Sequence, residues 1–349
     1  MRKSVFYLAG VVLLTSSSAQ AACTTSVVGN NFIFEGCNVI VRNGAGSTAT
    51  ANGVGNLIVG YNEDAAPANN RGGSHNLVIG PEHTYSSHGG LVAGSTNSIT
   101  AANTSVAGGA VNSASTQYAS IMGGAFNVAD GPTAASVHGG LGNRASGPAA
   151  SVTGGSANTA SSNNAAVCGG ANNTASGVGA TVAGGQWNEA SGTGSAVGGG
   201  GGAVQADGNR AQANNSAIAG GTANLIPFSG QQAAVLGGNL NQATGRYAAV
   251  SGGQLNEAAG LYASINGGWS GVADGEWAAI LGGRSNTVSA DYASSVGGIS
   301  NAVDTGGLYA VSVGGLANIV DGESSVSLGK QGPAGDTTTN LEIKPDPPF

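Results

Sequence analysis

The sequence ASVHGGLGNRASG, residues 135–147, starts again almost unchanged as ASVTGGSANTASS, residues 150–162. The shared unit is Ser or Ala, Val or Ile, a variable residue, Gly-Gly, two variable residues, Asn, a variable residue and Ala. Most copies are 15 residues apart, with single intervals of 16, 17 and 21. The branched residues of the unit are Val106, Ile121, Val137, Val152, Val167, Val182, Val197, Ile218, Val235, Val250, Ile265 and Ile280.

Each part of the unit has a conformational explanation. The Ser-Val segment predicts a short strand with one large inward residue. The Gly-Gly pair allows a turn with positive φ and a close approach of neighbouring backbones. A second short strand is expected through Asn-x-Ala, followed by a turn at pairs such as Ser146-Gly147 and Asp274-Gly275. A helix is a poor alternative because no 3.6-residue apolar period survives this glycine spacing.

Coil length decides among the stacked β folds. Fifteen residues at about 3.3 Å each trace only about 50 Å of path, which suits two short sides and two turns. We therefore predict an all-β fold, a two-sided parallel β-roll (a β-solenoid) with 15-residue coils. About eighteen coils at ~4.8 Å give a rod of roughly 85 Å.

The sequence predicts four regions. Residues 1–21 read as a signal peptide, with a basic start, a short apolar run and an A-x-A cleavage site. Residues 22–56 are expected to form an N-terminal cap, 57–330 the β-roll and 331–349 a polar, proline-containing tail. Looser copies of the unit are expected around Ser295-Val296 and Ser312-Val313, and Val326-Ser327-Leu328 closes the series.

One asparagine column runs through the repeats, and we interpret it as a structural ladder that satisfies turn backbone groups. Its members are Asn112, Asn127, Asn143, Asn158, Asn173, Asn188, Asn224, Asn241, Asn256, Asn286, Asn301 and Asn318.

The quoted units resemble the head repeats of trimeric autotransporter adhesins, the YadA-like heads. The resemblance covers about residues 57–330 and implies a left-handed parallel β-roll, a homotrimer and a head that binds host surfaces or matrix proteins. It extends to the head alone, because neither a coiled-coil stalk nor a membrane anchor is recognisable in the sequence. The thin core of each coil also favours further apolar burial between chains.

Composition limits the other functions. Charged residues make up 8% of the chain and the net charge is −7, so no basic patch points to nucleic acid. No apolar run is long enough for a transmembrane span. Cys23 and Cys37 are positioned either to pair in an oxidising compartment or to leave Cys23 for lipidation. Cys168 is expected to be a tolerated small residue.

No residue constellation points to catalysis, a cofactor or a metal. We interpret His75, His83, His88 and His138 as surface residues, because they lack the tight spacing of metal ligands. Matches to G-x-G-x-x-G carry no weight in a chain with 64 glycines.

Two features are candidate binding sites. Tyr247, Tyr262, Trp277 and Tyr292 recur every 15 residues, with Tyr118 and Tyr309 at the equivalent position. Stacked coils turn them into a stripe that binds sugars or proteins, or into a ladder that seals the roll. The second feature is the irregular coil 201–216, with Gln205, Asp207 and Arg210.

The sequence thus favours a secreted or surface-exposed, adhesin-like protein without enzymatic activity, which binds a host or matrix protein or a glycan. The alternatives are a structural component of an envelope or matrix and, less favoured, a carbohydrate-active enzyme or an ice-binding protein. The ligand and the means of attachment to a cell stay open.

Overall fold

The computed structural model describes residues 23–64, 68–329 and 341–343. The predicted signal peptide lies outside these residues, as does all of the predicted tail except 341–343. The chain divides into two compact units, Met1–Val41 and Arg42–Phe349. The division falls inside the predicted cap. Residues 42–56 belong to the second unit, where the backbone N–H of Gly53 donates to Gly72 and that of His75 donates to Gly55.

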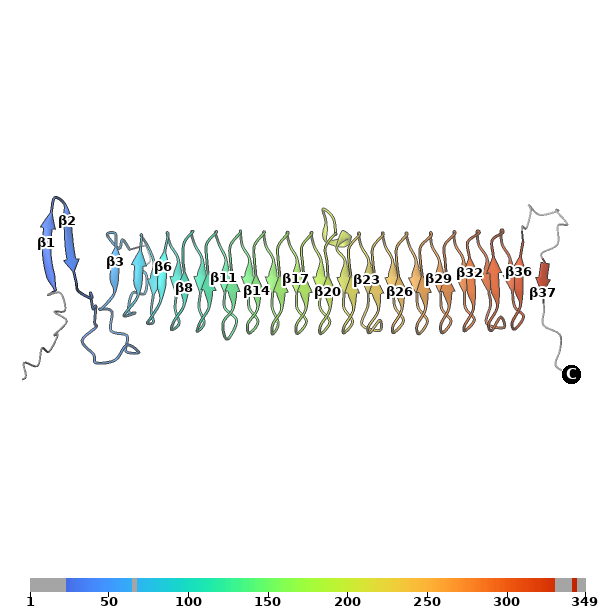
Figure 1. Ribbon diagram of the computed structural model, residues 1–349, viewed down its shortest axis with the longest axis horizontal. Coiled ribbons are helices and arrows are strands. Elements are labelled where there is room, and N and C mark those ends of the chain that lie inside the picture. Colours follow the sequence, from blue (N-terminus) through green and yellow to red (C-terminus); the bar gives the residue numbers. More distant parts are fainter. Residues whose placement is uncertain (1–22, 65–67, 330–340, 344–349) are drawn as a thin grey trace, which may run out of the picture. The chain divides into compact units, whose positions relative to one another are not determined.

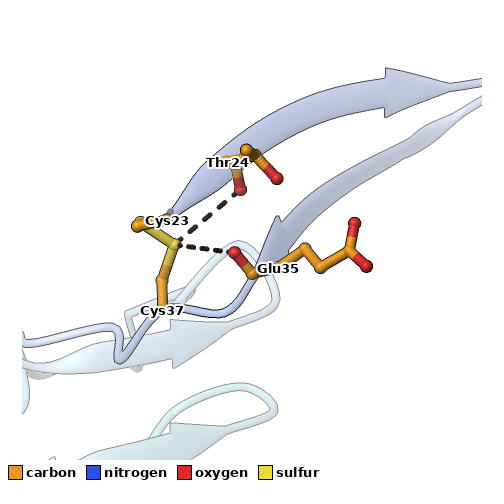
Figure 2. The surroundings of a disulfide bond; sticks show 4 residues. All are labelled: Cys23, Thr24, Glu35 and Cys37. Atoms are coloured by element: carbon orange, nitrogen blue, oxygen red, sulfur yellow. Dashed lines mark hydrogen bonds between the residues drawn. A yellow bond between two sulfur atoms is a disulfide. The ribbon is translucent and has the colours of Figure 1, made fainter. Parts of the chain in front are cut away.

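The described part of the first unit is a disulfide-closed hairpin. Strands β1 (Thr24–Val28) and β2 (Asn31–Glu35) pair antiparallel, and Gly29 takes a positive φ of 60° at the turn between them. Cys23 and Cys37 form a disulfide whose Cα atoms lie 4.9 Å apart, at the open end of the hairpin (Figure 2). The structure therefore selects pairing between the two alternatives for Cys23.

The second unit is a stack of coils (Figure 1), as the 15-residue period predicts. Apart from the coils at the two ends, each coil contributes one short strand to each of two parallel sheets, so the predicted all-β solenoid is confirmed. Sheet I contains β3 (Leu57–Val59), β4 (Leu77–Ile79), β6 (Leu91–Ala93), β8 (Ser105–Val106), β10 (Ser120–Ile121), β12 (Ser136–Val137), β14 (Ser151–Val152), β16 (Ala166–Val167), β18 (Thr181–Val182), β20 (Ala196–Val197), β22 (Ala217–Ile218), β24 (Ala234–Val235), β26 (Ala249–Val250), β28 (Ser264–Ile265), β30 (Ala279–Ile280), β32 (Ser294–Val296), β34 (Val311–Val313) and β36 (Val326–Leu328). The final strand β37 (Leu341–Ile343) pairs antiparallel with β36.

Sheet II has sixteen strands in the same order along the stack. They are β5 (Thr84–Tyr85), β7 (Ser98–Ile99), β9 (Ser113–Ala114), β11 (Val128–Ala129), β13 (Arg144–Ala145), β15 (Thr159–Ala160), β17 (Thr174–Ala175), β19 (Glu189–Ala190), β21 (Arg210–Ala211), β23 (Leu225–Ile226), β25 (Gln242–Ala243), β27 (Glu257–Ala258), β29 (Val272–Ala273), β31 (Thr287–Val288), β33 (Ala302–Val303) and β35 (Ile319–Val320). A column of single-residue parallel bridges follows the Gly-Gly turn, for example Ala110 with Ala125, and gives each coil a narrow third contact that the sequence does not predict.

The core consists of two facing columns of side chains, one of large residues and one of small residues. Sheet I points Val or Ile inward, such as Val152 and Ile265, and sheet II mostly points Ala inward, such as Ala160 and Ala273. All four are fully buried. Because one partner is only a methyl group, the core between the two sheets is thin.

The last coils depart from the predicted phase. Ser295 continues the inward column of Ile280, and Ser312 and Ser327 follow it. All three serines are buried, whereas Val296 and Val313 lie on the partly exposed side of the strand. Treating these valines as the inward residues is therefore wrong. Sheet II compensates in the same coils, where Val288, Val303 and Val320 replace alanine.

The asparagine column forms a buried hydrogen-bonded ladder. In a typical rung, the side-chain oxygen of Asn158 accepts the backbone N–H of Asn173 at 3.0 Å. The side-chain nitrogen of Asn158 donates to Gly154 in its own coil and to Gly170 in the next, each at 2.9 Å. Each asparagine therefore fastens the Gly-Gly turn of one coil to the next.

The ladder is longer than the predicted column. Asn97 and Asn209 are additional members. His83 stands at its head, where Nδ1 accepts the backbone N–H of Asn97 at 3.1 Å and Nε2 lies 2.9 Å from the carbonyl oxygen of Ile79. These contacts fix the neutral tautomer with the proton on Nε2. His83 is fully buried, so the prediction of a surface residue is wrong for it.

Candidate functional site

The predicted aromatic stripe is a ladder on one edge of the roll. The rings of Tyr247 and Tyr262 stack with centroids 4.7 Å apart, and those of Tyr262 and Trp277 stack at 4.1 Å. Tyr292 and Tyr309 form a second stack at 5.3 Å. The first stack ends in a cation, because the Arg246 guanidinium lies 4.8 Å from the Tyr247 ring centroid.

Stacking turns the aromatic faces toward one another. Sugars bind to aromatic rings through the ring face, and within each stack those faces are occupied by the neighbouring coils. The edges of the rings remain accessible, since Tyr262 is 37% and Trp277 48% exposed. This geometry favours the sealing ladder of the two interpretations of the stripe.

The aromatic ladder also occupies an unusual backbone position. Tyr247, Tyr262, Trp277, Tyr292 and Tyr309 all have φ between 56° and 61°. Bulky residues rarely adopt this left-handed region, and the conformation costs about 1–3 kcal/mol each. Ala134 and Ala149 occupy the same column elsewhere, so the turn does not require an aromatic residue.

The irregular coil is narrower than its predicted range. From Asn209 onward it is regular, because Asn209 joins the ladder and β21 pairs with β19. The extra residues lie between Gly201 and Gly208, and the short 3-10 helix η1 (Gln205–Asp207) lies within them. Figure 1 shows this segment, in yellow-green, projecting from the edge of the stack.

A pocket of about 420 Å³ lies beside this insertion. Thr174, Glu189 and Arg210 form one row of its wall, since they are consecutive outward residues of β17, β19 and β21. A second row consists of Asn172 and Trp187, which precede the ladder asparagines of two neighbouring coils. We call this concavity, completed by Gln205 and Ala206 of the insertion, the insertion pocket.

The predicted loop residues have different positions. Gln205 and Arg210 line the insertion pocket, whereas Asp207 is not part of its lining. The Asp207 carboxylate instead accepts the backbone N–H of Val204 at 3.4 Å within the insertion. Sequence analysis missed Trp187, Glu189, Asn172 and Thr174. Counting back one and two coils from the insertion would have found them.

No model of a known protein family matches this chain, and neither does any curated protein. The pocket and the ladders therefore have to be interpreted from their own chemistry.

The remaining candidates do not come together as a site. Among the described residues, no group of three or more His, Cys, Asp or Glu side chains is placed to hold a metal. His75 binds backbone, with Nδ1 3.2 Å from the Thr48 carbonyl oxygen, and Glu82 accepts the Thr96 hydroxyl. Cys168 is an exposed free cysteine, at a variable position as predicted. Among residues 23–64, 68–329 and 341–343, no helix has the length and apolarity that a bilayer crossing requires.

Proposed function

We propose that the chain is an exported, adhesin-like protein that binds other molecules through a rigid repeat rod and performs no catalysis. The observation that carries this proposal is the in-register stack. Most coils repeat the same inward contacts, so outward residues at equivalent positions become continuous columns on a stiff scaffold. Such scaffolds present extended binding surfaces.

Export is supported by the disulfide. Cys23 and Cys37 are paired, and disulfides persist in oxidising environments such as the periplasm and the cell exterior. Together with the predicted signal peptide, this supports an extracellular or cell-surface location.

Trimer formation, which the resemblance to YadA-like heads implies, has its own support. Large apolar side chains are exposed in the outward column after the inward Val or Ile, with Met122 62%, Leu236 58% and Leu281 52% accessible. Leu141 and Ile299, in the bridge column of the same turn, are 52% and 46% accessible. These are single large residues among small and polar ones such as Ser251 and Asn266, and a homotrimer would bury them between chains.

Two measurements test the proposal. Purified mature protein is applied to immobilised matrix proteins and to a panel of immobilised glycans, and saturable binding to at least one surface is expected. Light scattering is expected to give three times the chain mass. Absence of binding to every surface would contradict the adhesin proposal and favour a spacer in an envelope or matrix. A stable monomer would contradict the trimer.

A further inference from the structure

We propose that the insertion pocket binds a neutral saccharide. The inference deepens the adhesin-like function proposed above and rests on it, because it names the class of molecule that one part of the rod recognises.

The polar groups of the pocket are left without partners by the protein. Within the described part of the chain, the side chains of Thr174, Glu189 and Arg210 make no hydrogen bond or ion pair, nor do those of Asn172, Trp187 and Gln205. Their backbones, by contrast, are bonded in the stack, as in the donation from Trp187 to Ala171 at 3.0 Å. Six side chains able to donate or accept hydrogen bonds thus face one concavity.

Glu189 and Arg210 are the clearest example of side chains in the pocket that lack a partner. They are direct neighbours across β19 and β21, where opposite charges ordinarily pair. Elsewhere in sheet II, Arg144 contacts Asp130 at 2.6 Å. The Glu189 carboxylate is therefore free to accept hydrogen bonds from a ligand, and the Arg210 guanidinium is free to donate them.

Charge and size define the ligand class. One carboxylate and one guanidinium leave the pocket without net charge, so it does not select an anion or a cation. Hydroxyl groups suit the lining, because each hydroxyl both donates and accepts. A volume of about 420 Å³ accommodates one or two sugar rings.

Trp187 supplies the apolar part of the site. It is half-buried, and no stacking partner covers its ring among the described residues, unlike Trp277 in the aromatic ladder. An indole that no other ring or cation stacks on can pack against the C–H face of a sugar ring while the surrounding polar groups bind the hydroxyls. The combination of an unstacked aromatic ring with unpaired polar groups favours a saccharide over a peptide side chain.

The test is isothermal titration of the mature protein with glucose, galactose, mannose, N-acetylglucosamine and lactose, each up to about 10 mM. At least one is expected to bind with a dissociation constant at or below the millimolar range, which is ordinary for one small pocket. Trp187→Ala is expected to weaken that binding at least 10-fold. The variant should fold, since Ala157 and Ala223 occupy the same position with φ of 55° and 56°.

Phe126→Ala is the matched control. Phe126 has the same column position, a φ of 58° and 58% exposure, and it lies outside the pocket, so its loss should leave saccharide binding unchanged. Glu189→Gln and Arg210→Gln should each weaken binding, and Gln242 shows that this column of sheet II accepts glutamine. Deleting residues 202–207 restores a 15-residue coil and should abolish binding.

Two results would overturn the inference. One is that no neutral sugar binds the wild-type protein, including the case in which only charged sugars bind. The other is that Trp187→Ala and the deletion bind as the wild type does. The adhesin-like function is judged separately, by wild-type attachment to surfaces. Attachment that survives Trp187→Ala, with sugar binding lost, would show that attachment uses another surface, whereas sugar binding without attachment would contradict the adhesin-like function alone.

Discussion

At the scale of single residues, the two glycines of most Gly-Gly pairs have different roles. The second, such as Gly170, has a φ of +84°, and a Cβ there would clash with the carbonyl group of Gly185 in the next coil and lie 2.8 Å from its nitrogen. The first, Gly169, lies outside the positive-φ region and has no atom within 4 Å of an added Cβ.

A matched pair of substitutions follows from this difference. Gly170→Ala should destabilise the solenoid by at least about 3 kcal/mol, because it combines left-handed strain with a clash against rigid backbone. Gly169→Ala should be neutral or stabilise by up to about 1 kcal/mol, since alanine restricts the unfolded chain. Denaturant unfolding compares the two, and equal effects would contradict the assignment.

The ladder has one gap, at Gly271. Its backbone N–H donates to Asn256 at 2.9 Å, but without a side chain it offers no amide oxygen to the backbone N–H of Asn286. Gly271→Asn should supply that oxygen and let its side-chain nitrogen donate to Gly267 and Gly283, which stabilises by about 1–3 kcal/mol. Thermal unfolding measures the gain. Gly271→Ala is the control, and a gain of the same size there would show that the amide is not responsible.

Much of the residue pattern was readable in the sequence, because a ladder needs the same amide at the same spacing. The Asn column and the inward Val and Ile residues up to Ile280 are confirmed. His83 was missed because it is not an asparagine, although its ring nitrogens donate and accept at the same two places. The phase of the last coils was mispredicted at Ser295-Val296-Gly297-Gly298. This segment resembles the Ser-Val-x-Gly-Gly unit but has one residue fewer before the glycines.

At the scale of strands, the two sheets exchange side-chain volume between coils. Where sheet I has the small Ser295, sheet II has Val303 instead of the usual alanine, so each coil still buries one large and one small side chain. The exchange has a cost, because the buried hydroxyl oxygen of Ser295 has no hydrogen-bond partner among the described residues.

A double-mutant cycle tests the exchange. Ser295→Val alone should destabilise by about 1–3 kcal/mol, because valine overfills a space already occupied from the facing sheet. Adding Val303→Ala should recover most of that loss, and the unpartnered hydroxyl is already absent from the Ser295→Val variant. Stability is measured by urea unfolding of the four proteins. Strictly additive effects would mean that the two columns do not share one packing space.

The aromatic ladder gives the second prediction at this scale. Replacing Tyr247, Tyr262 and Trp277 together by alanine removes two stacks and should lower stability by about 1–3 kcal/mol, with the stack still folded. Near-UV circular dichroism and thermal unfolding measure the loss. Unchanged stability together with lost attachment to a surface would instead show that the stripe is a binding site.

The insertion pocket shows where sequence reasoning stopped. Gln205 was found because it lies in the segment that breaks the period, and Arg210 because it falls within the coil 201–216 predicted to be irregular, whereas Trp187 and Glu189 look like ordinary members of variable columns. Their importance depends on which coil they lie in, and that is known only once the register of Glu189 with Arg210 is known.

At the scale of the whole chain, the hairpin and the solenoid are separate units. Cys23→Ser with Cys37→Ser should therefore leave the main thermal transition of the solenoid within about 1 °C, while the hairpin loses its structure, because two strands alone are marginal in water. Circular dichroism follows the solenoid, and proteolysis between residues 23 and 41 reports on the hairpin. A large shift of the main transition would mean that the units stabilise each other.

The asparagine ladder also has a direction, since each amide oxygen accepts the backbone N–H of the ladder residue in the following coil and never of the one in the preceding coil. A folded coil therefore presents an unpaired amide oxygen that can accept the backbone N–H of the next ladder residue along the chain. If the exported chain crosses the membrane in extended form with its N-terminus first, folding can begin at His83 and advance coil by coil as further residues emerge. The free energy released as each coil folds then opposes movement of the chain back across the membrane.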